Sequence, residues 1–167
     1  MKIIIPVIQT LHQGWIDSYL TSVEYGFLAN SCRLQKKKPN AQRLNLLKEY
    51  IQKEEFFFSS IVLGIIPYSG DIGNLNFEFK PLTNGDDRGH LEINQSFYCC
   101  VLDGNSRVAA IVDSVEENPQ LSQEKIPCIF VIPQSQVEID RLISDLSKKV
   151  FVTDNKPQPI SFRPRRR

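Results

Sequence analysis

An unbroken apolar run that passes through Asp-Gly into a helical pattern is the feature of this chain that most restricts its fold. Residues 97–102, FYCCVL, have the composition of a buried strand, and Asp103 and Gly104 supply turn chemistry directly after it. Apolar side chains then recur at helical spacing, at Val108, Ile111, Val112 and Val115. The stretch therefore predicts a strand, a tight turn and an amphipathic helix in succession.

Other strands and helices are expected to alternate along the rest of the chain. Apolar runs and alternating patterns predict strands at 2–10, 17–23, 56–66, 75–82, 90–94 and 125–133. The turn-rich TNGDDRG predicts a hairpin between the fourth and fifth of these. Periodic apolar residues predict further helices over 41–54 and around Ile139, Leu142, Ile143 and Leu146, and residues 150–162 are expected to be extended. We expect an α+β fold, with a mixed sheet and packed helices, in one compact domain over 1–162.

The charge is distributed unevenly. Four of the twenty basic residues lie in 163–167, so residues 1–162 carry 16 basic against 19 acidic side chains. The folded body is therefore not a generally basic DNA-binding surface, and any affinity for nucleic acid must come from a local patch or from the tail.

The cysteine pattern and the hydropathy indicate the compartment in which the chain is expected to fold. The four cysteines form no CxxC pair, and neither histidine lies at ligand spacing from them, which favours small buried thiols in a reducing cytosol over a metal site or a disulfide. No apolar run approaches the ~20 residues that a membrane-spanning helix needs, and the N-terminal segment lacks a cleavage site. We expect a cytoplasmic protein with no membrane partner and no metal.

The turn after the 97–102 strand could bind an anion. A helix that starts there leaves backbone N–H groups unpaired, at the positive end of the helix dipole. Gly104 would allow close approach, and Arg107, one turn in, could bind an anion bidentately. The alternative is a plain connection in which Asp103, Asn105 or Ser106 is an N-cap and Arg107 is solvated.

Residues 101–111, VLDGNSRVAAI, resemble the signature of the DGQHR-domain family, in which an apolar strand runs into Asp-Gly-Gln-His-Arg and a helix rich in small residues. Three further segments resemble family strands and loops in the same order: FFFSSIVLGI, IPCIFVI and VFVTDNKPQPIS. The resemblance covers about residues 3–162. It implies a fold similar to ParB and sulfiredoxin, in which this turn binds phosphate groups of a nucleotide or nucleic acid.

The family includes DndB-like proteins of DNA phosphorothioation systems, where sulfur replaces a non-bridging phosphate oxygen. The resemblance implies negative transcriptional control of the modification genes, with DNA or a nucleotide and other phosphorothioation-system proteins as partners. Hydrolysis of ATP with Mg is also attributed to some members. Family members commonly continue into a further helical region, so we expect a truncated or split member.

The motif departs from the family at two positions. Asp103, Gly104 and Arg107 match, but Asn105 stands where Gln is usual and Ser106 where His is usual. Ser106 can donate to a phosphate, yet it removes the one motif residue that titrates near neutral pH and is a poor general base alone. We therefore expect anion binding rather than catalysis, and we assign no catalytic residue.

Two other places could contact the ligand. The resemblance puts Thr153, Asn155 and Lys156 beside the turn, whereas an Asx-type turn is the alternative. The tail could contact nucleic-acid phosphates through Arg163, Arg165, Arg166 and Arg167. For the tail, and more so for Lys36 to Lys38, a solvated charge run is the competing interpretation.

The leading hypothesis is a DndB-like regulatory module that binds DNA or a nucleotide through residues 103–107. The alternative is an ATPase or phosphodiester-cleaving enzyme on the same fold. A third is a fragment with a role in protein interaction.

Overall fold

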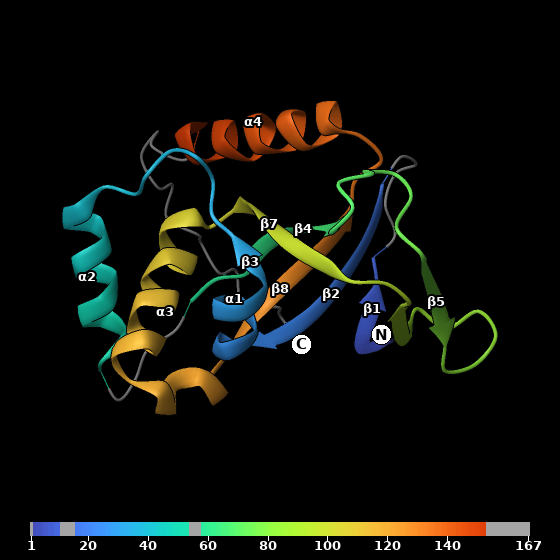
Figure 1. Ribbon diagram of the computed structural model, residues 1–167, viewed down its shortest axis with the longest axis horizontal. Coiled ribbons are helices and arrows are strands. Elements are labelled where there is room, and N and C mark those ends of the chain that lie inside the picture. Colours follow the sequence, from blue (N-terminus) through green and yellow to red (C-terminus); the bar gives the residue numbers. More distant parts are fainter. Residues whose placement is uncertain (1, 11–15, 54–57, 153–167) are drawn as a thin grey trace, which may run out of the picture.

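The computed structural model describes residues 2–10, 16–53 and 58–152, which form a mixed sheet with helices on both faces (Figure 1). The order of the strands in the sheet is β3-β7-β4-β8-β2-β1-β6-β5. The strands are β1 (Ile3–Gln9), β2 (Asp17–Glu24), β3 (Cys32–Arg33), β4 (Ile61–Pro67), β5 (Phe77–Pro81), β6 (Arg88–Ile93), β7 (Phe97–Asp103) and β8 (Lys125–Ile132). The helices are α1 (Tyr25–Ser31), α2 (Ala41–Ile51), α3 (Asn105–Glu117), the 3-10 turn η1 (Pro119–Gln123) and α4 (Gln136–Val152).

The pairing of the strands makes the sheet mixed. Strand β3 runs parallel to β7, and β4 runs parallel to β8, whereas the other neighbours are antiparallel. The expected hairpin is the β5–β6 pair, in which Phe77 lies opposite Ile93. The α+β class expected from the sequence is confirmed, with helices packed on a single mixed sheet.

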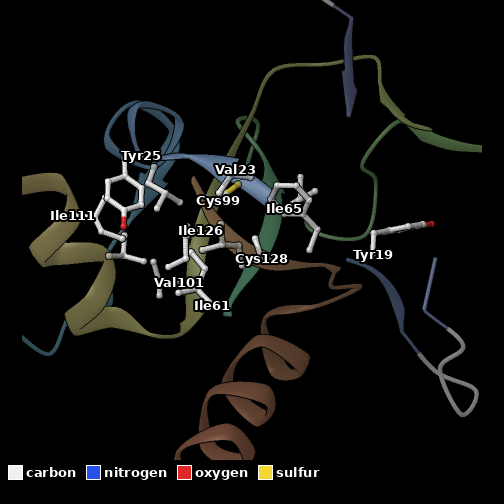
Figure 2. Close-up of a cluster of buried hydrophobic side chains, with 14 of the residues drawn as sticks. Tyr19, Val23, Tyr25, Ile61, Ile65, Cys99, Val101, Ile111, Ile126 and Cys128 are labelled. Atoms are coloured by element: carbon white, nitrogen blue, oxygen red, sulfur yellow. The ribbon is translucent and has the colours of Figure 1, made fainter. Parts of the chain in front are cut away.

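Side-chain alternation along β7 divides the core between the two faces of the sheet. Cys99 and Val101 are buried in the larger cluster, with Tyr25 of α1 and Ile111 of α3 (Figure 2). The alternate residues of β7, Tyr98, Cys100 and Leu102, point to the other face, where Leu102 packs in a smaller cluster with Ile139 of α4. Helices α1 and α3 therefore cover one face of the sheet and α4 covers the other, while α2 packs outside α3 (Figure 1).

Three short elements were not predicted, and one prediction is wrong. Helix α1, strand β3 and the turn η1 span seven, two and five residues, too short to carry a periodic pattern. Residues 150–152 were expected to be extended, but α4 continues through Val152. Val-Phe-Val favours strand by composition, whereas extending a helix that has already formed adds one hydrogen bond for each residue fixed. The remainder of the segment, 153–162, lies outside the described residues.

No helix in the described ranges combines the length and apolarity that a membrane span requires. In the same ranges, no group of three or more His, Cys, Asp and Glu side chains is arranged to hold a metal ion.

The four cysteines are free thiols, and they give a first prediction about reactivity. Burial raises the pKa of Cys100 to about 11, and it also raises the pKa of Cys128. The pKa of Cys99 is raised by its hydrogen bond with Cys32 and by burial. Because only the thiolate is nucleophilic, we expect iodoacetamide at pH 8 to modify Cys99, Cys100 and Cys128 at least about tenfold more slowly in the native protein than in guanidinium. Peptide mapping after timed labelling checks this, and equal rates in both states would contradict it.

Candidate nucleic-acid interface at the start of helix α3

The turn between β7 and α3 depends on Gly104. Its backbone is left-handed, with φ +90° and ψ 24°, a conformation that side chains with a Cβ rarely adopt. A Cβ on Gly104 would lie 2.7 Å from Cγ2 of Ile61 and 3.0 Å from Nη2 of Arg107. The N-cap position of α3 is therefore held by Gly104, not by Asp103, Asn105 or Ser106.

This choice of N-cap affects the first turn of α3. The first intrahelical bond runs from Val108 N to Gly104 O, at 2.9 Å. Gly104 contributes no side-chain acceptor to the backbone N–H groups of residues 105–107, which follow it in the first turn. The first backbone N–H groups of α3 therefore have no N-cap side chain as acceptor. Together with the positive end of the helix dipole, they can donate to an anion.

Arg107 is largely enclosed rather than solvated, since its side chain is only 17% exposed. Its Nη1 donates to the carbonyl oxygens of Ser59, at 2.8 Å, and Ser60, at 3.1 Å, and also to the Ser59 hydroxyl. Its Nη2 donates to Oδ2 of Asp103 at 3.3 Å, which forms an i,i+4 ion pair. The guanidinium therefore joins the end of β7, the start of α3 and the segment that leads into β4.

The environment of Arg107 also acts on its protonation. Burial lowers the pKa of Arg107, the nearby charge of Arg43 lowers it further, and Asp103 opposes both effects. An arginine remains protonated at neutral pH despite such a shift. Arg107 is thus a positioning residue for the turn, and a direct contact from its remaining N–H groups to an anion stays a prediction.

Asn105 connects the turn to a segment that is far away in the sequence. Its Oδ1 accepts a hydrogen bond from Gln35 N at 2.9 Å, and its Nδ2 donates to Lys37 O at 3.3 Å. Gln35 in turn donates through Nε2 to the carbonyl oxygens of Val101 and Leu102, at 3.1 and 3.3 Å. The shorter amide found at this motif position therefore fastens residues 35–37 beside the first turn of α3.

This attachment brings basic side chains to the turn. Lys36, Lys37 and Lys38 are all exposed, and so is Arg43 in the first turn of α2. Helix α2 starts there because Oδ1 of Asn40 caps it, accepting from Gln42 N at 2.9 Å and Arg43 N at 3.2 Å. We call these four residues, Lys36, Lys37, Lys38 and Arg43, the basic rim. Arg43 lies close enough to Arg107 for its charge to lower the pKa of Arg107, and the acidic side chain of the turn, Asp103, is paired with Arg107.

Sequence reasoning assigned only part of this site. A solvated run was the competing interpretation of the lysines, because the hydrogen bonds that place their segment span about seventy residues of sequence. Arg43 was missed altogether. The Asn40 cap is a local signal that fixes where α2 starts, but not what it faces. Thr153, Asn155 and Lys156 lie outside the described residues, as do the four tail arginines, so their roles stay predictions.

Comparison with known proteins identifies the family. The family model described as DndB, DNA-sulfur modification-associated, matches residues 8–155. No curated protein and no solved structure matches the chain. The expected similarity to the ParB and sulfiredoxin fold therefore stays a prediction. The matched span includes β7, the Gly104 turn, α3 and the three lysines of the basic rim. This chain therefore belongs to the DndB family of DNA-sulfur modification-associated proteins.

Proposed function

We propose that this protein is a DNA-binding regulatory module of a DNA-sulfur modification system, and that it contacts phosphate groups through the start of α3 and the basic rim. Regulation here means repression of the modification genes, the role implied by the resemblance to DndB-like proteins. Membership of a family associated with DNA-sulfur modification makes DNA the first ligand to test.

The observation that carries the proposal is the double hydrogen bond of Asn105 to the 35–37 backbone. It holds three consecutive lysines next to a helix start that has no N-cap side chain. Lysine ammonium groups and free backbone N–H groups are both donors to phosphate oxygens. Because the rest of the folded body is net acidic, this local patch is the part of the described surface best suited to a polyanion.

The geometry supports binding more than hydrolysis. Ser106 stands where the family motif has histidine, and the Asp103 carboxylate is already paired with Arg107. Neither group is placed as a free general base. Phosphate release from ATP with magnesium, measured on the same preparation, separates the two functions, since turnover abolished by Asp103→Ala would favour an enzyme.

Titration of duplex DNA by fluorescence anisotropy at several salt concentrations tests the proposal. Each protein contact to a duplex phosphate contributes about 0.9 to the slope of log affinity against log salt. We expect Lys36→Gln/Lys37→Gln to weaken binding and to reduce this slope by roughly 2. The matched control is Lys2→Gln/Arg88→Gln. It removes two exposed cations from the other half of the sheet, Lys2 just before β1 and Arg88 in β6, and should leave the slope unchanged.

Asn105→Ala provides a second arm that changes no charge. It removes the attachment of the 35–37 backbone, so we expect weaker DNA binding with the three lysines still present. An absence of DNA binding by the unmodified protein at low salt would refute the proposal. Equal slopes for the lysine variant and the unmodified protein would remove the basic rim from the interface.

A further inference from the structure

Two tyrosine rings and an arginine meet at the sheet edge formed by β3, and the lysines of the basic rim follow this strand along the chain. The Arg33 guanidinium carbon lies 3.7 Å from the ring centroid of Tyr98 and 5.5 Å from that of Tyr68. The two tyrosine rings meet edge to face, with centroids 5.7 Å apart and planes inclined at 67°. Tyr68 is 58% exposed, and Arg33 is exposed as well. We call these three residues the aromatic edge.

Strand register explains why these three side chains meet. Ile66 lies opposite Tyr98, so Tyr68, two residues later, points to the same face of the sheet. Arg33 is paired with Cys100, two residues after Tyr98, which puts Arg33 on that face too. The backbone N–H of Tyr68 donates to Ser96 O at 3.0 Å and fixes the chain just beyond β4.

The aromatic edge is continuous with the basic rim through the chain itself. Only residues 34 and 35 separate Arg33 from the three lysines. Gln35 forms hydrogen bonds with the backbone of β7 and with the Asn105 side chain. From Tyr98 to Asp103 the strand advances about 16 Å, at ~3.3 Å per residue. That length corresponds to roughly five stacked nucleotides at ~3.4 Å each.

We propose that the aromatic edge stacks an unpaired nucleobase of single-stranded DNA whose phosphates lie along Lys36, Lys37 and Lys38. This inference rests on the proposed function and deepens it, because it names single-stranded DNA as a ligand of the same surface. Aromatic rings next to a line of cations are the combination by which proteins hold single strands without reading sequence. An arginine plane adds a second surface for stacking.

The exposure of Tyr68 is what points to an unpaired base. In a duplex the faces of each base are covered by its neighbours in the stack, so a protein ring reaches a base face only where the strand is open or ends. The lysines alone would bind single-stranded and duplex DNA through phosphates without this distinction. A free nucleotide presents the same base face, so the experiment has to separate a strand from a mononucleotide.

The test uses the full chain and a single-stranded oligonucleotide of about eight nucleotides with a central 2-aminopurine, a base whose fluorescence is quenched by stacking. We expect quenching on binding, and about tenfold weaker binding with lost quenching for Tyr68→Ala. Tyr68→Phe keeps the ring and should behave like the unmodified protein. Leu82→Ala, a truncation of another exposed large side chain near the opposite sheet edge, is the control.

Three outcomes overturn the inference. They are unchanged affinity and quenching in Tyr68→Ala, equal loss of duplex and single-strand binding in that variant, and binding of 2-aminopurine nucleotide as tightly as of the oligonucleotide. The first two can occur while duplex binding by the unmodified protein persists, in which case the proposed function stands and the aromatic edge falls. If the protein binds neither form of DNA, the proposed function itself is refuted. Thermal melting of each variant separates a lost contact from a lost fold.

Discussion

Gly104→Ala is expected to lower the free energy of unfolding by about 2–4 kcal/mol. The substitution forces a Cβ into a left-handed conformation and to within 2.7 Å of Cγ2 of Ile61, at the start of buried β4. Neither neighbour can move without disturbing the core, because Ile61 is fully buried and Arg107 is held by the carbonyl oxygens of Ser59 and Ser60. Urea denaturation followed by circular dichroism measures the effect.

Gly85→Ala is a matched control for this experiment. Gly85 has φ +81°, close to that of Gly104, but a Cβ there would meet nothing within 4 Å. It should therefore show the conformational cost alone, about 1 kcal/mol. If the two variants lose equal stability, the crowding at Gly104 is absent and the turn has room for a larger residue.

Arg107→Met is expected to destabilise the fold by about 2–4 kcal/mol, with a larger effect than removal of any basic-rim lysine. Methionine keeps much of the side-chain length but leaves the carbonyl oxygens of Ser59 and Ser60, and the Asp103 carboxylate, without their donor. Arg107→Lys should recover only part of the loss, since one ammonium cannot reproduce the fork of two nitrogens. Denaturation midpoints of the three proteins test this order.

Arg88→Met is the control for the arginine series. Arg88 also pairs with an aspartate, Asp86, but its side chain is 67% exposed, so we expect a change within about 0.5 kcal/mol. Unchanged stability in Arg107→Met would contradict the positioning role. Weaker DNA binding by Arg107→Met at unchanged stability would instead make the guanidinium a direct phosphate contact.

Gly104→Ala and Arg107→Met, compared with the lysine variants, separate effects on the fold from effects on DNA binding. Gly104 and Arg107 shape the turn, so their loss should change stability first and DNA binding as a consequence. Lys36 and Lys37 have exposed side chains, so their loss should change the salt dependence of binding at nearly constant stability. The reverse pattern would place the functional contact in the turn itself.

Local sequence patterns predict much of this fold. The apolar run over 97–102, the Asp103-Gly104 turn and the spacing of Val108 and Ile111 predict a strand, a turn and a helix, and the structure has β7, Gly104 and α3 in these places. The hairpin of β5 and β6 was predicted in the same way. Such features depend on neighbours within one turn or one strand, so the sequence displays them directly.

Other features needed the tertiary structure. Helix α1 and strand β3 are too short to show a period, and α4 extends through residues whose composition favours strand. The sequence left Arg107 either binding an anion or solvated, whereas its partners Ser59 and Ser60 are 48 and 47 residues away in sequence. Nothing in the residues around Arg107 indicates that Ser59 and Ser60 will lie beside it.

The sequence by itself determined that a strand ends in a glycine turn at a helix start, because that depends on apolar periodicity and on the backbone freedom of one residue. Only the tertiary structure decided what surrounds this turn. Asn105 forms hydrogen bonds with Gln35 and Lys37, which are 70 and 68 residues away in sequence, and β-sheet register places Arg33 beside Tyr98 and Tyr68. Long-range hydrogen bonds and register are properties of the packed sheet, so the basic rim and the aromatic edge exist only once it has formed.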